Sequence, residues 1–247
     1  MLGYTMKGRD TIPGNGISPF SGLDLSAFDL FGSLSKDAVD AIERLCTFRR
    51  FAVHERIMER DSDSRDVLLF ISGSAKILNY SVSGREIVFD DLLAGSSFGE
   101  ISAIDDQPPL AEVVATDPVV VMVIPQRVFI DAVNTYPEVA LSVMRRLARI
   151  IRAADERIMD LSTLAAHHRV YAEVLRRAYA RMTSENRAEI APIPLHSEIA
   201  SKTSTTRETV ARAISNLARR GIVSRAKTAL CVNDVYALHQ IVARVRP

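Results

Sequence analysis

Residues 196–223, HSEIASKTSTTRETVARAISNLARRGIV, contain two helical patterns separated by a short polar turn. The first helix is expected to begin near Ser197, and the second at Thr205 or Thr206, where a threonine suits the N-cap position. Ser204 occupies a turn position that favours a positive φ. The internal face shared by the two helices is expected to consist of Ile199, Ala200, Val210, Ile214 and Leu217. The pattern predicts a helix-turn-helix.

Polar and charged side chains gather at the start of the second helix. Arg207, Glu208 and Arg212 project from its first turns, and a helix that enters the major groove by its N-terminal end presents such side chains to base edges. The candidate DNA contacts are Lys202, Thr205, Thr206, Arg207, Glu208 and Arg212. Phosphate contacts are also expected from Arg219, Arg220, Arg225 and Lys227. The overlapping segment RGIVSRAKTALCVND predicts a two-stranded wing after the second helix.

The net charge is divided unequally along the chain. Residues 165–247 contain 14 Lys and Arg against 6 Asp and Glu, whereas residues 1–164 contain 17 against 24. The C-terminal part therefore carries +8 and suits a polyanion such as double-stranded DNA, while the remainder carries −7. No apolar run approaches the roughly 20 residues that span a bilayer, so a cytoplasmic protein without membrane contact is expected.

The composition also limits the chemistry of the chain. Cys46 and Cys231 are too few for a disulfide framework or a four-cysteine metal or iron–sulfur site, and no metal site is predicted. The sequence shows no nucleophile–base pair, phosphate-binding glycine loop or metal-ligand spacing. We therefore expect neither an enzyme nor a cofactor.

Short β-type runs follow one another from Phe48 to Ile124. VLLFI, AKILNYSV, EIVFDDL and VVVMVIP are separated by glycine-containing turns at roughly hairpin spacing. This spacing is typical of an antiparallel β-roll or barrel, and we assign the roll to residues 31–134. Residues 1–30 show no sustained periodicity and are expected to form a flexible N-terminal extension.

A long helical pattern occupies residues 135–165. After Pro137, apolar residues recur at spacings of three and four: Val143, Leu147, Ile150, Ala154, Ile158, Leu161 and Ala165. Such a narrow seam either packs on the roll of the same chain or pairs two subunits. Its charged flanks favour a two-stranded coiled coil, so we predict a dimer interface made by Val143, Leu147, Ile150, Ala154, Ile158 and Leu161. Residues 166–247 then form the DNA-binding domain.

The order of roll, central helix and winged helix-turn-helix resembles the CRP/FNR family of bacterial transcription regulators over residues 31–247. GREIVFDDLLAGSSFGEISAID, residues 84–105, and TSTTRETVARAISNL, residues 203–217, carry the resemblance. It implies an α+β fold with a cyclic-nucleotide-binding-type β-roll, a long dimerisation helix and a C-terminal winged helix-turn-helix.

The resemblance also implies a function for the second helix. Arg207, Glu208 and Arg212 match the Arg-Glu-x-x-x-Arg with which CRP-like members recognise TGTGA-type half-sites. Both arginines are then expected to donate to guanines, and Glu208 to accept from a cytosine amino group. A homodimer would recognise an inverted repeat and contact RNA polymerase.

The effector pocket implied by the resemblance is incomplete in this chain. Gly99 and Glu100 retain the Gly-Glu pair that takes the phosphate and ribose of cAMP, and Ile101 and Ser102 add backbone N–H groups. Pro109 and Leu110 stand where those members carry Arg-Ser. The Thr-Ser pair that contacts adenine aligns with Ala154-Asp155. Without the arginine a buried phosphate loses about 1.5 to 3 kcal/mol, so control by ordinary cAMP binding is not expected.

Three interpretations of this pocket stay open. In the first, Leu110 and Ala154 fill a pocket that no longer binds a ligand, the dimer binds DNA without an effector, and Asp155 pairs with Arg152 or with an arginine of the other subunit. In the second, a different ligand, less anionic or larger, binds the roll or the surface between the domains. In the third, cyclic nucleotides bind weakly through Gly99, Glu100 and another arginine.

A function of another class is also considered. A ligand-binding or interaction module with a similar roll would use its C-terminal segment without any DNA role. The +8 balance and the complete helix-turn-helix pattern argue against this alternative.

Overall fold

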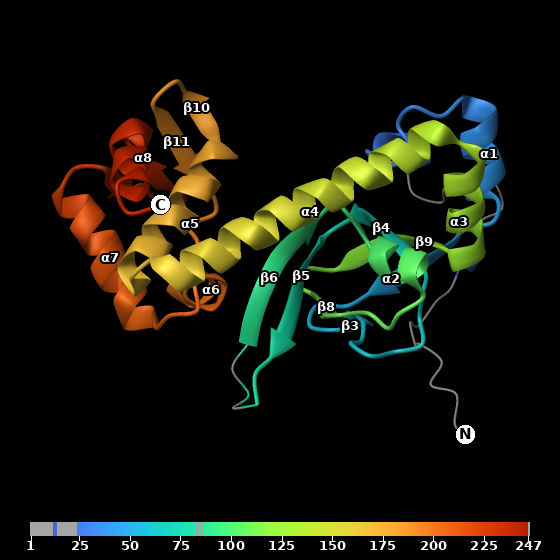
Figure 1. Cartoon of the computed structure of the whole chain (residues 1–247), viewed down its shortest axis with the longest axis horizontal. Coiled ribbons are helices and arrows are strands. Elements are labelled where there is room, and N and C mark those ends of the chain that lie inside the picture. Colours follow the sequence, from blue (N-terminus) through green and yellow to red (C-terminus); the bar gives the residue numbers. More distant parts are fainter. Residues whose placement is uncertain (1–11, 14–23, 83, 85, 247) are drawn as a thin grey trace. The chain divides into compact units, whose positions relative to one another are not determined.

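The computed structural model describes residues 12–13, 24–82, 84 and 86–246 and divides the chain into two compact units, Met1–Arg149 and Ile150–Pro247. The division lies within the long helix α4 (Pro137–Thr163), and Figure 1 labels α4 and several elements of each unit. Strands and helices occur in both, which agrees with the predicted α+β class. Among the described residues no helix combines the length and apolar character needed to cross a membrane.

The N-terminal unit contains the predicted antiparallel β-roll. One sheet contains, in spatial order, β1 (Ile12–Pro13), β2 (Thr47–Phe51), β9 (Val119–Ile124), β4 (Val67–Ser72) and β7 (Ser97–Phe98). The other contains β3 (Arg56–Met58), β8 (Glu112–Ala115), β5 (Ser74–Tyr80) and β6 (Glu86–Leu93). Phe70 and Val121 of the first sheet and Val113 of the second are fully buried in one apolar cluster, because alternate residues of each strand point inward.

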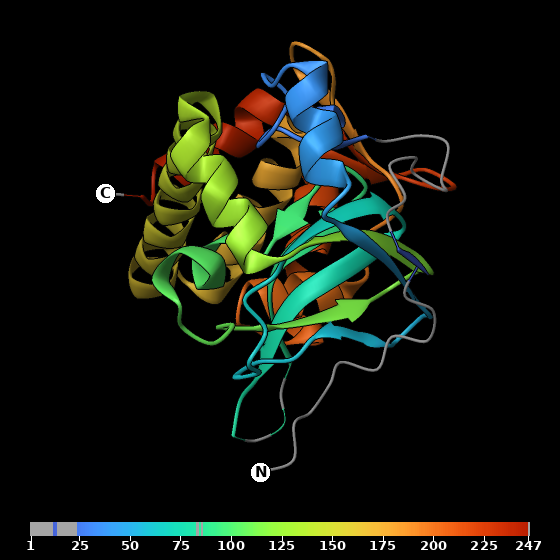
Figure 2. The same cartoon turned by 90° about the vertical axis from the view of Figure 1, so that its right-hand side faces the viewer.

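Helices cover the other face of the first sheet. They are η1 (Leu25–Ala27), α1 (Lys36–Glu43) and α3 (Gln126–Thr135), and Figure 2 shows α1 and α3 beside the strands. The Ser35 hydroxyl accepts a hydrogen bond from the Ala38 N–H and so caps α1. Ile42 and Phe129 pack with Met122 of β9 in a second apolar cluster. This cluster fixes the helices on the roll.

The chain before α1 differs in part from the prediction. Leu25, Phe28 and Leu30 are at most 2% exposed and belong to the same cluster as α1 and α3. The prediction of a flexible extension is therefore wrong for residues 24–30, because three large apolar side chains gain burial there. The prediction is also wrong for Ile12 and Pro13, which form β1 and pair with β2. Its other residues, 1–11 and 14–23, lie outside the described residues.

The C-terminal unit combines helices with a small sheet. Its helices, besides the end of α4, are α5 (Ala166–Tyr179), α6 (His196–Lys202), α7 (Arg207–Arg219) and α8 (Val235–Ala243). Its antiparallel sheet contains β10 (Met182–Ser184), β11 (Arg187–Ile190), β13 (Leu230–Val232) and β12 (Val223–Arg225), in this order. Val174 of α5, Val210 of α7 and Leu238 of α8 are fully buried in the core of this unit.

Candidate nucleic-acid interface and effector pocket

The helix-turn-helix forms where the sequence predicts it. Ile199 and Leu217 are buried between α6 and α7, and Ala200 lets the two helices approach closely. Ser204 has φ +49°, as its place in the turn predicts. Thr206 is the N-cap of α7, and its hydroxyl accepts a hydrogen bond from the Thr209 N–H at 3.2 Å. The turn and the cap together fix where α7 begins.

The predicted base-reading side chains are exposed at this capped end. Arg207, Glu208 and Arg212 are all exposed, and the Arg212 guanidinium lies 3.4 Å from the Thr209 hydroxyl. The pKa of Glu208 is lowered because its own backbone N–H and the Thr206 side chain bond to the carboxylate and because Arg212 and Arg207 lie nearby. Its carboxylate therefore stays ionised at neutral pH and is available as an acceptor.

The other candidate contacts lie at the end of α6, in the turn and on the wing. Lys202 ends α6, and Thr205 follows the turn with its N–H bonded to the Ala200 carbonyl at 3.0 Å. Arg225 and Lys227 are exposed on the wing formed by β12 and β13. The structure thus brings the predicted base and phosphate contacts together within one unit.

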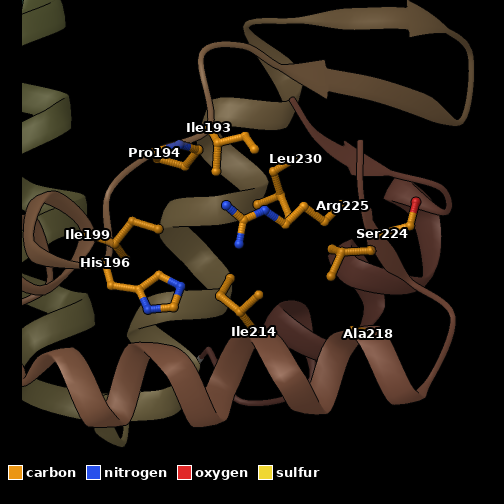
Figure 3. A pocket seen from close by; sticks show the side chains of 10 residues that line it. Ile193, Pro194, His196, Ile199, Ile214, Ala218, Ser224, Arg225 and Leu230 are labelled. Atoms are coloured by element: carbon orange, nitrogen blue, oxygen red, sulfur yellow. The ribbon is translucent and has the colours of Figure 1, made fainter. Parts of the chain in front are cut away.

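A cavity of about 100 Å³ lies between α6, α7 and the wing (Figure 3). Its lining is mainly apolar, and the Arg225 guanidinium is directed toward its middle. It is lined by Ile193, Pro194, His196, Ile199, Ile214, Ala218, Val223, Ser224, Arg225 and Leu230. None of the residues predicted for the effector pocket lines this cavity.

The Gly-Glu pair of the predicted effector pocket lies at the start of α2 (Glu100–Asp105). Gly99 has φ +101°, and a Cβ at this position would collide with the carbonyl oxygen of Asp66, so only glycine fits. Ile101 and Ser102 occupy the first turn of α2, and Ser102 is buried. These four predicted residues therefore lie together at one edge of the roll.

The Arg146 side chain forms an ion pair with the Glu100 carboxylate of this Gly-Glu pair. The sequence analysis did not predict this ion pair. Arg146 Nε donates to Glu100 Oε1 at 2.6 Å, and its Nη2 donates to the Ser97 carbonyl oxygen at 2.6 Å. The Glu100 side chain is 3% exposed and that of Arg146 is 25% exposed. Glu100 Oε2 is buried and has no hydrogen-bond partner among the described residues. The guanidinium of α4 therefore neutralises a buried carboxylate within the chain.

The substituted positions of the predicted pocket differ in burial in the single chain. Pro109 is buried, whereas Leu110 is 69% exposed. The Leu110 carbonyl oxygen accepts a hydrogen bond from the Asn79 amide at 2.9 Å. Ala154 is exposed in the single chain, and the filling of a pocket at the dimer by Leu110 and Ala154 stays a prediction. Asp155 is exposed too.

The exposed apolar seam of α4 differs from the predicted interface at two of its six positions and shares the other four, Leu147, Ala154, Ile158 and Leu161. Val143 is 4% exposed in the core of the N-terminal unit, so its prediction as an interface residue is wrong. Ile150 is half-buried, whereas Met144 is 57% and Ile151 66% exposed. An alternating spacing of three and four residues joins Met144, Leu147, Ile151, Ala154, Ile158 and Leu161. Ile158 and Leu161 are 62% and 43% exposed, and Ala154 is exposed.

Comparisons with known proteins agree with this architecture. A model of the cyclic nucleotide-binding domain matches residues 48–136, and a model of the Crp-like helix-turn-helix domain matches residues 143–241. The cyclic AMP receptor protein of Thermus thermophilus is 27% identical over 214 residues, which cover 86% of this chain and 95% of that protein.

Solved structures show the same fold. A CRP-family transcriptional regulator from Thermus thermophilus is 25% identical with a TM-score of 0.60, covering 81% of this chain and 98% of that one. A CooA mutant from Carboxydothermus hydrogenoformans is 18% identical with a TM-score of 0.73, covering 89% and 97%. The family and the fold are those of DNA-binding transcription regulators and not of enzymes. The chain belongs to the CRP/FNR family of transcription regulators.

Proposed function

We propose that this regulator binds, as a homodimer, an inverted DNA repeat with TGTGA-type half-sites. The observation that carries the proposal is the exposure of Arg207, Glu208 and Arg212 together at the capped start of α7. Two guanidinium groups suit the O6 and N7 acceptors of guanine, and an ionised carboxylate suits the amino group of cytosine. Lys202, Thr205 and Thr206 are assigned to the flanking phosphates. Such a regulator acts on chromosomal DNA in the cytoplasm and contacts RNA polymerase.

The dimer is assigned to the exposed seam of α4. Ile151, Ala154, Ile158 and Leu161 repeat with the spacing of a two-stranded coiled coil and leave apolar surface in water in the single chain. Pairing two such seams buries that surface and places two recognition helices in one molecule. The two helices then match the two halves of an inverted repeat.

The residues of the predicted effector pocket favour DNA binding that needs no cyclic nucleotide. Pro109 and Leu110 supply neither a cation nor a hydroxyl for a cyclic phosphate. Glu100 is already paired with Arg146 at 2.6 Å, so a ribose would have to share or displace this contact. Both features weaken the usual cAMP site and leave the dimer active on its own.

A different effector is the second candidate. The buried Oε2 of Glu100 has no partner among the described residues, and an unsatisfied carboxylate oxygen favours a ligand with a hydroxyl or amine donor. Such a ligand would be less anionic than cAMP, because no arginine stands at position 109. Titration of the roll with neutral polyols and nucleosides distinguishes this candidate from an effector-free regulator.

Replacing Arg212 with Ala is expected to weaken binding to the specific repeat by about 1 to 3 kcal/mol and to relax specificity at one base pair. The reason is the loss of a guanidinium that contacts a base edge. Fluorescence anisotropy on the repeat and on its single-base variants measures both effects. Arg219→Ala is the matched control, since loss of a phosphate contact weakens binding equally on all sequences. An equal loss for Arg212→Ala on every duplex would contradict the base-reading role.

A further inference from the structure

We propose that a clamp at the end of α4 fixes the recognition helix to the dimerisation helix and thereby sets the spacing between half-sites that the dimer accepts. The inference rests on the proposed function, because it assumes a dimer that binds an inverted repeat. The clamp consists of Arg157, Asp160, Arg169 and Arg246, all within the C-terminal unit. These residues are positioning residues and have no assigned contact with DNA.

Asp160 is the centre of the clamp. Its side chain is 9% exposed, and it accepts two hydrogen bonds from Arg246, from Nε at 2.9 Å and from Nη2 at 2.8 Å. Arg176 of α5 lies 3.4 Å from the same carboxylate and also pairs with the buried Glu173 at 2.5 Å. A two-point bond between guanidinium and carboxylate has a fixed geometry. The last described residue of the chain is thus held against α4.

Two arginines bind the turn that precedes the recognition helix. Arg157 of α4 donates from Nη2 to the Lys202 carbonyl oxygen at 2.8 Å, at the C-terminal end of α6. Arg169 of α5 donates to the carbonyl oxygens of Thr203 and Ser204 at 2.9 and 3.2 Å. It also donates to the Leu164 carbonyl oxygen at 2.9 Å, directly after α4. The turn and the end of α4 are therefore held by the same guanidinium.

The clamp and the dimer seam use different faces of one helix. Arg157, Asp160 and the buried Leu164 recur every three or four residues and face the core of the unit. Ile151 and Ile158 stand on the neighbouring face and are exposed. An α-helix is stiff over two turns, so the seam, the clamp and α7 move together. In a dimer paired by this seam, the distance between the two recognition helices is then fixed.

The test measures spacing tolerance with the full chain. Affinities are measured by anisotropy on inverted repeats with the optimal spacer, on repeats lengthened by one and two base pairs, and on a single half-site. The affinity of the wild type is expected to fall about tenfold or more when the spacer is lengthened by two base pairs. The reason is that the second half-site rotates away from the recognition helix that would bind it. In Arg157→Ala and Arg246→Ala, the ratio of the affinity for the optimal repeat to that for the lengthened repeat is expected to fall to about threefold or less. The affinity for a single half-site should stay unchanged. Arg246→Lys is expected to recover part of the discrimination.

Arg177→Ala is the matched control, because Arg177 pairs with the buried Glu173 at 2.8 Å and does not belong to the clamp. It should keep the discrimination of the wild type. Unchanged discrimination in the Arg157 and Arg246 variants would overturn the proposal, and so would a loss of single half-site affinity, which would indicate a merely structural role.

A second measurement needs no DNA. Amide hydrogen exchange in the connection at residues 164–169 is expected to become faster in Arg246→Ala than in the wild type and to stay unchanged in Arg177→Ala. If the wild type shows no preference for any inverted repeat, the proposed function fails. The exchange measurement alone then tests whether the clamp holds the connection. Equal exchange in all three proteins would then overturn it.

Discussion

The Ile158→Glu variant is expected to bind an inverted-repeat operator about 100- to 10,000-fold more weakly than the wild type. Ile158 lies in the exposed α4 seam and is 62% exposed in the single chain. A glutamate there places two like charges opposite each other in the dimer and removes the apolar surface that pairing would bury. Each half-site is then bound separately, and the advantage of two linked contacts is lost.

Size-exclusion chromatography with light scattering measures the oligomeric state, and anisotropy on the operator measures the affinity. Met159→Glu is the matched control, because Met159 is 42% exposed on the same helix but outside the seam. It should stay dimeric with unchanged affinity. A monomeric wild type, or an Ile158→Glu variant that remains a dimer, would refute the assignment of the interface to this seam.

Replacing Arg146 with Ala is expected to lower the free energy of unfolding by about 3 kcal/mol, because it leaves the Glu100 carboxylate buried without its positive partner. Because Arg146 is 25% exposed, the expected loss of unfolding free energy is at the low end of the range for buried ion pairs. Urea unfolding followed by circular dichroism measures the change.

A second substitution separates charge from packing. The double variant Arg146→Ala/Glu100→Gln should be more stable than Arg146→Ala alone, because a neutral amide is less costly to bury unpaired than a carboxylate. If Arg146→Ala costs less than about 1 kcal/mol, the pair behaves as a surface salt bridge and Glu100 is accessible to water.

The helix-turn-helix could be predicted because its signals are local. Thr206 as a cap, the turn at Ser204 and the apolar spacing from Ile199 to Leu217 depend on neighbours within a few residues. The β-roll could be predicted for a similar reason, because its strands are short apolar runs separated by turn residues. Local hydrogen bonds and alternating burial determine both features, and both are visible in the sequence.

The exposed seam of α4 differs from the predicted interface at two of its six positions, Val143 and Ile150. Val143 and Met144 are adjacent and both apolar, as are Ile150 and Ile151, so spacing alone does not decide which member of each pair faces outward. Packing determines which residue faces outward, because Val143 is buried in the core around α3 and Met144 is exposed. The phase of a helix therefore depends on a partner that is distant in the sequence.

The ion pairs were not predicted at all. Arg146 and Glu100 are 46 residues apart, and Arg246 and Asp160 are 86 residues apart. An arginine on a helix surface is usually a solvated charge, and no local pattern marks the few that reach a buried carboxylate. Only the fold brings these partners together.

The most direct test of the central claim, a dimer that binds its operator without a cyclic nucleotide, is an anisotropy titration of the purified protein. The duplex carries two TGTGA-type half-sites, the salt concentration is fixed, and parallel titrations contain no nucleotide, cAMP, cGMP or cyclic di-GMP. We predict tight binding of the operator, at least about 1,000-fold tighter than of random DNA, with the same affinity in all four titrations. Operator binding that appears only with one nucleotide would contradict the account and identify that nucleotide as the effector.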